Sequence, residues 1–159
     1  MKVTKRISDG IEFISKVLAA LFIAAITGVL TYQVILRIVF NSGLSWSVEF
    51  SNYAVIWAVM LIANVLIKNN EMINVDFLDD FFPENFKKVR DIAYRFVFTI
   101  MLFIMLYYGW KLALGSFHKS TPALGISKFY PYLAIPVGAL LMIYQYFYQI
   151  ILNIKKGGE

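Results

Sequence analysis

Four long runs without a formal charge alternate with shorter segments that hold the charged residues. The runs are 17–36, 50–67, 96–110 and 129–154. A helix rises about 1.5 Å per residue and the apolar core of a bilayer is about 30 Å thick, so roughly 20 residues span it. The pattern therefore predicts four transmembrane helices, at about residues 14–38, 46–68, 90–112 and 130–154.

Between the second and third runs lies a segment whose large apolar residues recur at helical spacing. Ile73, Phe77 and Phe81 are four residues apart, whereas the aspartates lie largely off that stripe. This pattern predicts a short amphipathic helix in the membrane interface, at about 72–88, with both phenylalanines in lipid. The alternative is that the phenylalanines cover one end of the helix bundle.

Composition agrees with an all-α integral membrane protein that forms a single membrane domain. The 159 residues are 60% hydrophobic and 16% charged, whereas a soluble domain is about one quarter charged. There is no cysteine and one histidine, His118, which excludes disulfide chemistry, thiolate metal sites and a multi-ligand haem. We expect no cofactor and no metal. The first run is too long for a signal peptide and is interpreted as a retained helix.

The lysines and arginines predict an orientation. Four lie in the N-terminal tail, five in the segment 68–95 and two in the C-terminal tail, whereas the other side holds Arg37, Lys111, Lys119 and Lys128. The positive-inside rule then places both termini in the cytoplasm of a multi-pass bacterial inner-membrane protein. The same distribution explains the net charge of +5 by topology, so no nucleic-acid partner is expected.

Glu49 stands at the start of the second predicted span. The positive end of a helix dipole favours an anion there, with Ser45 or Ser47 as the N-cap. Pairing with Arg37 across the preceding turn is a further possibility. This structural interpretation outweighs a proton relay, because a carboxylate at a helix end needs no transport role to explain it. Trp46 belongs to an aromatic belt at the same interface.

Three stripes of polar or small residues recur at helical spacing, and each is interpreted as a packing surface. No acidic residue lies at mid-membrane in the predicted spans, which favours packing over a solute pathway. The stripes are Ala20, Ala24 and Gly28 in the first span, Glu49, Tyr53, Trp57, Asn64 and Lys68 along the second, and Gln145, Gln149 and Asn153 in the fourth.

Several short motifs, in order, resemble the DctQ family, the small membrane subunit of TRAP transporters. They comprise Arg37 and Asn41 near the end of the first span, W-x-x-E at Trp46 and Glu49, a basic residue at Lys68, V-D at Val75 and Asp76, Pro83, and STPALGISKFYPYLAIPVGALLMIYQ from Ser120. The resemblance covers nearly the whole chain. Departures include Val48 at an often acidic position, Lys68 in place of arginine, and Met72 where many members have histidine.

The resemblance implies a tripartite, ATP-independent uptake system and no enzymatic activity. A periplasmic substrate-binding protein would deliver an organic anion to a membrane pair. The large TRAP membrane subunit would hold the substrate and sodium sites, and the small subunit would brace it among the membrane lipids. Overall similarity points to the sialic acid branch among carboxylate substrates.

Two other classes of protein remain as alternatives. One is a self-sufficient four-helix transporter that acts as a dimer; such transporters need a carboxylate in the first span, and run 17–36 has none. The other is a structural membrane assembly factor, which gene neighbourhood would distinguish from a TRAP subunit.

Overall fold

The computed structural model describes residues 2–69 and 84–156, which are almost entirely helical. The elements are α1 (Lys2–Phe40), α2 (Ser45–Lys68), α3 (Glu84–Gly115), the short α4 (Phe129–Tyr132) and α5 (Ala134–Lys156). Among the described residues, four helices are long and apolar enough to cross a membrane. The predicted all-α membrane fold with four spans is confirmed. The predicted interfacial residues Phe77 and Phe81 lie outside the described residues.

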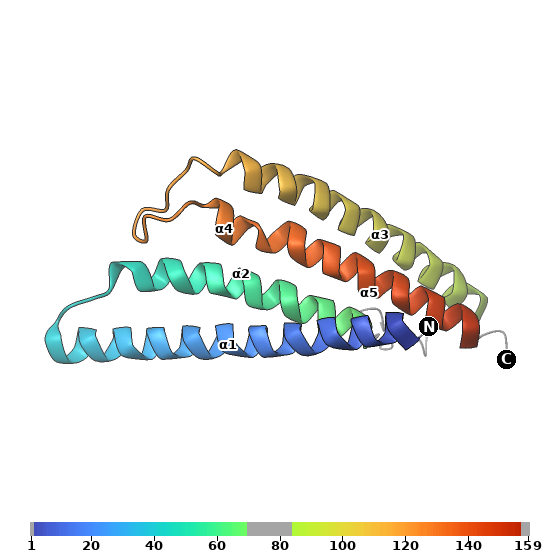
Figure 1. Cartoon of the computed structure of the whole chain (residues 1–159), viewed down its shortest axis with the longest axis horizontal. Coiled ribbons are helices and arrows are strands. Elements are labelled where there is room, and N and C mark those ends of the chain that lie inside the picture. Colours follow the sequence, from blue (N-terminus) through green and yellow to red (C-terminus); the bar gives the residue numbers. More distant parts are fainter. Residues whose placement is uncertain (1, 70–83, 157–159) are drawn as a thin grey trace.

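The long helices form a row rather than a closed bundle. Helix α1 packs against α2, α2 against α5, and α5 against α3 (Figure 1). Only 11% of the apolar window of α1 and 17% of that of α3 is buried, against 39% in α2 and in the span formed by α4 and α5. Helices α1 and α3 are therefore the two edges of the row, and each leaves much of its apolar surface uncovered within this chain.

The two ends of the row differ. Helix α1 begins and α5 ends at the same end, here called the terminal end, and the α1–α2 turn and residues 116–128 lie at the opposite loop end (Figure 1). Helix α1 has 39 residues and is about 58 Å long, well beyond the thickness of an apolar core. Its first residues therefore extend past the predicted span of 14–38.

The turn between α1 and α2 explains why α1 ends where it does. Asn41 adopts φ 50°, and the amide of Ser42 donates to the carbonyl of Leu36 at 3.4 Å. A left-handed residue at the end of a helix stops the helical path, and asparagine is one of the few residues other than glycine that adopts this conformation routinely. Gly43 and Leu44 then connect to α2 within three residues of that turn.

Two glycines allow α5 to approach both neighbouring helices closely. A Cβ on Gly138 would lie 2.7 Å from Cβ of Met60 in α2, and one on Gly109 of α3 would lie 2.7 Å from Cγ2 of Ile135. Small residues at helix contacts are how membrane helices gain van der Waals packing without a hydrophobic driving force. The buried cluster around them contains Ile67, Leu102, Met142 and Tyr146.

Candidate functional site: polar contacts at the two ends of α2

Lys68, the last residue of α2, lies between two carboxylates of α1. Its Nζ is 2.5 Å from Oδ1 of Asp9 and 2.6 Å from Oε2 of Glu12, and its side chain is only 10% exposed. Glu12 also pairs with Lys16 one turn later, at 2.5 Å. A cation at a helix C-terminus is favoured by the dipole, and here it has two specific anionic partners.

A layer of amides and hydroxyls lies next to this ion pair. Ser8 Oγ donates to Oε1 of Gln145 at 2.6 Å, and Nε2 of Gln145 donates back to the carbonyl of Ser8 at 3.1 Å. Nδ2 of Asn64 donates to Oγ of Ser15 at 3.0 Å. These four side chains are buried. Buried polar contacts between membrane helices contribute roughly 0.5–2 kcal/mol each, so together they favour one arrangement of the helices.

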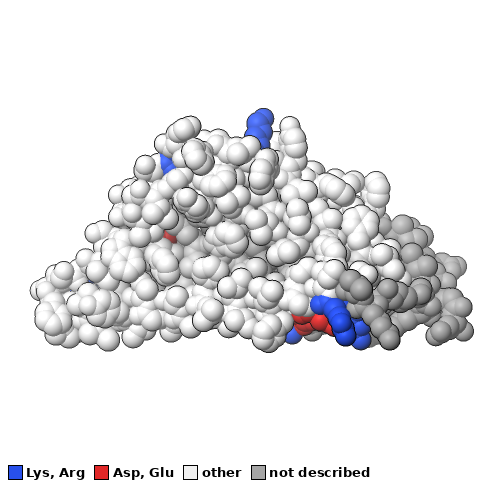
Figure 2. Space-filling model, in the orientation of Figure 1, with Lys and Arg blue, Asp and Glu red and all other residues white. Residues whose placement is uncertain are grey.

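These contacts join three helices. Nε2 of Gln149 in α5 also donates to the carbonyl of Lys68, so α1, α2 and α5 meet at one point. We call this set the terminal network; it comprises Ser8, Asp9, Glu12, Ser15, Asn64, Lys68, Gln145 and Gln149. Figure 2 shows the surrounding face as largely uncharged, with its largest cluster of red and blue atoms toward the terminal end.

One polar atom of the terminal network has no partner among the described residues. Oδ1 of Asn64 is buried without a hydrogen bond, as is Oγ of Ser51 on the same helix. A buried amide that makes only part of its hydrogen bonds weakens the network relative to a fully satisfied one. Asn64 is therefore the position at which a substitution could add most to the stability that this network provides.

At the loop end, Glu49 holds a loop instead of capping its own helix. Its Oε2 accepts the backbone N–H groups of Ala123 at 2.8 Å and Leu124 at 3.0 Å, and its Oε1 accepts the hydroxyl of Tyr53 at 3.0 Å. Lys128 lies within electrostatic range of the same carboxylate. The carboxylate thus fastens α2 to a segment about 75 residues later in the chain.

Two expectations about the start of α2 were wrong. The N-cap position is Leu44 and has no side-chain cap, so neither Ser45 nor Ser47 caps the helix. Because α2 begins at Ser45, Glu49 falls just beyond the first turn. Within residues 2–69 and 84–156, Glu49 forms no ion pair with Arg37. Arg37 is exposed.

The loop that Glu49 holds is a small hairpin. The amide of Thr121 donates to the carbonyl of Ile126 at 2.8 Å, and that of Lys128 donates to the carbonyl of Lys119 at 2.9 Å. Gly125 turns the chain at φ 68°. The hydrogen bonds within the hairpin leave the N–H groups of Ala123 and Leu124, at its tip, directed at Glu49. An acidic residue at position 49 is explained by these two donors, which a carboxylate accepts strongly.

The stripe on α2 faces the chain itself along its whole length. Trp57 stacks on Phe22 of α1 with ring centroids 6.3 Å apart, between the Glu49–Tyr53 pair and the Asn64 contact. An open pocket of about 170 Å³ lies beside Tyr53 and Trp57, and Leu124 and Ile126 of the loop also line it. Trp46 is 37% exposed and meets Phe50 edge to face, as an interfacial aromatic does.

The other two stripes have different surroundings. Gln145 and Gln149 lie in the terminal network, whereas nothing is described of the side chain of Asn153. Ala20, Ala24 and Gly28 are exposed, and a Cβ on Gly28 would meet nothing within 4 Å. Ala19, one position earlier, is the buried residue. The stripe on α1 therefore has no packing partner within residues 2–69 and 84–156.

Sequence reasoning missed the α1 half of the terminal network. Ser8, Glu12, Ser15 and Ala19 repeat at spacings of four, three and four, which is one face of a helix. Ser8 and Glu12 lie before the predicted span of 14–38, so the stripe was not followed past the start of that span. Pairing that stripe with Asn64 and Lys68 would have located the contact.

Comparison with known proteins finds relatives of this chain over most of its length. Residues 26–156 match the tripartite ATP-independent periplasmic transporters, DctQ component. The chain is 29% identical over 137 residues to the sialic acid TRAP transporter permease protein SiaT of Haemophilus influenzae, covering 86% of this chain but 22% of SiaT. It therefore spans about a fifth of that longer relative.

Two shorter relatives match over most of their length. A putative TRAP transporter small permease protein of Haemophilus influenzae is 23% identical, across 100% of this chain and 94% of the relative. The sialic acid TRAP transporter small permease protein SiaQ of Vibrio cholerae is 22% identical, across 91% of this chain and 82% of SiaQ.

The fold and these matches define a multi-pass membrane subunit of a transporter. The chain belongs to the DctQ family, whose members are the small permease components of TRAP transporters and work with a large permease subunit. The family resemblance drawn from the sequence motifs is confirmed.

Proposed function

We propose that this chain braces the large permease subunit of a sodium-coupled TRAP transporter that takes up an organic acid, with sialic acid as the substrate. SiaT and SiaQ, two of its relatives, are sialic acid TRAP transporter proteins by name. Sodium coupling and delivery by a periplasmic binding protein are what the family resemblance implies. The enclosing membrane is the bacterial inner membrane.

The observation that carries the bracing role is the uncovered face of α1. The buried residues Ser8, Ser15 and Ala19 mark the side of α1 that meets α2. At 100° per residue, Ala20, Ala24 and Gly28 lie on the opposite side of the helix. An exposed stripe of small residues on a spanning helix suits close approach by another membrane helix. We assign that place to the large subunit.

The match to SiaT supports the same proposal. There the region similar to this chain is about a fifth of one longer permease protein. When two parts are joined in one polypeptide in a relative, this supports a close and permanent contact between the corresponding separate subunits. The terminal network would keep α1 fixed on α2 and α5, so that a contact on α1 is transmitted to the whole row.

The orientation in this proposal follows the charge count. The terminal end faces the cytoplasm, and the hairpin held by Glu49 faces the periplasm. The loop end is then the side from which a substrate-binding protein would approach. Between Gly115 and Lys128 the chain contains two lysines and no acidic residue, so an approaching partner would meet a basic surface.

Reconstitution tests this function directly. Proteoliposomes containing this chain, the large permease encoded beside it and the cognate binding protein should accumulate labelled sialic acid when a sodium gradient is applied. Liposomes with this chain alone should not. Sodium-dependent accumulation by the chain alone would contradict the bracing role, and uptake of other carboxylates but not sialic acid would contradict the substrate.

A further inference from the structure

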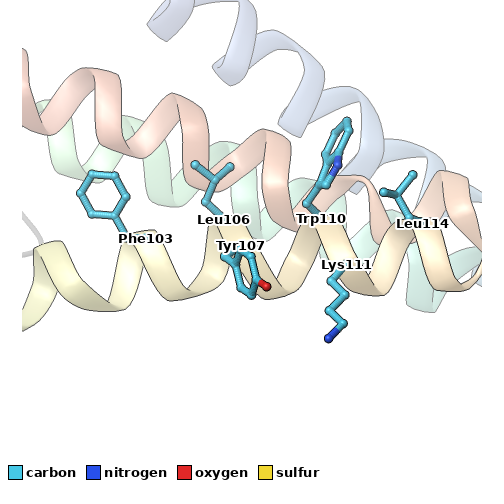
Figure 3. A pocket seen from close by; sticks show the side chains of 6 residues that line it. All are labelled: Phe103, Leu106, Tyr107, Trp110, Lys111 and Leu114. Carbon is cyan, nitrogen blue, oxygen red and sulfur yellow. The ribbon is translucent and has the colours of Figure 1, made fainter.

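The outer surface of α3 carries an apolar groove with a lysine beside it. The groove has a volume of about 670 Å³ and is lined by Phe103, Leu106, Tyr107, Trp110, Lys111 and Leu114, all on α3. In Figure 3 the side chains of Leu106 and Trp110 extend to one side of the helix, and those of Tyr107 and Lys111 to the other. The groove runs along the last turns of the α3 span, toward the loop end.

A second groove, of about 480 Å³, lies beside the first and meets it at Lys111. It is also lined by Tyr108, Ser116 and Lys119. Lys111 therefore borders both grooves, and Lys119 borders the second, in the loop beyond Gly115. An occupant of the whole surface must be apolar over most of its length and anionic at one end.

In the part of the chain that the structure describes, no carboxylate pairs with either lysine. The sequence contains no acidic residue between Ile92 and Gly158. Glu49 is near Lys128 and already accepts three hydrogen bonds. Within residues 2–69 and 84–156, the ion pairs involve Lys16 and Lys68, and neither Lys111 nor Lys119 takes part in one.

We propose that this edge of α3 binds an anionic phospholipid, with its phosphate held by Lys111 and Lys119 and an acyl chain along Phe103, Leu106 and Trp110. A soluble acidic protein could reach Lys119 but would not enter a groove within the span. A neutral helix would cover the groove but would leave two lysines unpaired at the membrane surface. A phospholipid matches both features, and two neighbouring cations favour an anionic headgroup over a zwitterionic one.

The position of α3 in the row leaves room for such a lipid. Among the helices, α3 packs against α5 and α4 on one side, so its other side has no described neighbour. It is the edge opposite to α1, and the lipid site does not depend on the docking proposed for α1. Failure of either proposal would leave the other standing.

Lipid binding to the purified full-length chain tests the site without any transport measurement. Native mass spectrometry would compare phosphatidylglycerol with phosphatidylcholine carrying the same acyl chains. We expect tighter binding of phosphatidylglycerol to the wild type. Each Lys→Gln substitution at Lys111 or Lys119 should weaken that binding about fivefold, and raised salt should weaken it further.

Two controls distinguish lipid binding at this site from a general effect of positive charge on the protein. The double variant K5Q/R6Q removes two exposed cations at the terminal end and should leave the affinity unchanged, and K111R/K119R keeps the charge and should retain binding. Equal binding of the two lipids to the wild type would overturn the proposal. So would equal losses in K5Q/R6Q and K111Q/K119Q. If K111Q/K119Q does not fold, salt dependence and the lipid preference of the wild type still decide.

Discussion

Nζ of Lys68, at the end of α2, lies 2.5 Å from the carboxylate of Asp9 near the start of α1. The two residues are 59 positions apart in the sequence. Their contact joins the ends of α1 and α2 that lie away from the turn between these antiparallel helices. Glu12 completes the ion pair from one turn further along α1. Together with the buried amides next to it, this contact determines how the edge helix α1 sits on the row.

Replacing Lys68 should destabilise the chain more than replacing any other lysine of this cluster. Lys68→Met leaves the carboxylate of Asp9 without its cation and that of Glu12 with Lys16 alone. We expect a loss of about 2 kcal/mol, below the range for a fully buried pair, because Asp9 is 53% exposed. Lys16→Met is the matched control, because Lys16 is 52% exposed and makes one i,i+4 pair, so it should cost about 0.5 kcal/mol or less.

Thermal unfolding in detergent, followed by tryptophan fluorescence, measures both variants. Adding Asp9→Asn and Glu12→Gln to Lys68→Met removes the unpaired charges and should recover part of the lost stability. Equal effects of Lys68→Met and Lys16→Met would show that the terminal network does not hold the helices together.

Removing the Glu49 carboxylate should release the hairpin at residues 119–128. Glu49→Ala leaves the N–H groups of Ala123 and Leu124 without their acceptor, so hydrogen exchange in this loop should accelerate. Tyr53→Phe removes one hydroxyl but not the carboxylate and should have a smaller effect. Peptide-level hydrogen exchange measures the difference, and unchanged exchange in Glu49→Ala would contradict this role for Glu49.

A methyl group should be costly at Gly138 and harmless at Gly28. Gly138→Ala brings a Cβ to 2.7 Å from Cβ of Met60, and the forced separation of α2 and α5 should cost about 1–3 kcal/mol. Gly28→Ala meets nothing within 4 Å and, in mid-helix, should be neutral or slightly stabilising. Thermal unfolding of the two variants tests this, and equal stability would contradict the close approach at Gly138.

The predicted orientation can be tested with single cysteines, since the chain has none of its own. Thr4 and Ser120 are both exposed and lie at opposite ends of the row. In intact spheroplasts, an impermeant thiol reagent should label Ser120→Cys and not Thr4→Cys. Labelling of Thr4→Cys alone would reverse the orientation and move the hairpin to the cytoplasm.

The order and type of the main elements followed from the sequence because long uncharged runs have few alternatives. The stripe from Glu49 to Lys68 was predicted to face protein, and its contacts are with α1 and the hairpin. Its individual bonds were not predicted, since the hairpin that Glu49 holds is 75 residues away and no local pattern links the two. The N-cap of α2 was predicted wrongly because serine near a helix start need not cap it.

The arrangement of the helices in a row could not be derived from the sequence. Hydropathy identifies spans but says little about which spans are neighbours. The decisive contacts involve single glycines, Gly109 and Gly138, and pairs such as Ser8 with Gln145, 137 residues apart. The role of each of these residues can be recognised only when the helix that it contacts is known.

In this proposal, the Ala20, Ala24 and Gly28 face of α1 docks on the large permease subunit. The sharpest test is co-purification of that subunit with a tagged chain carrying Ala24→Leu, compared with Ala25→Leu. Ala25 is also exposed, at a similar depth, about 100° away from Ala24 around the helix. We predict that Ala24→Leu lowers recovery of the large subunit at least fivefold while Ala25→Leu does not, with equal thermal stability of the two isolated chains. Equal recovery of the large subunit with both variants would contradict the account.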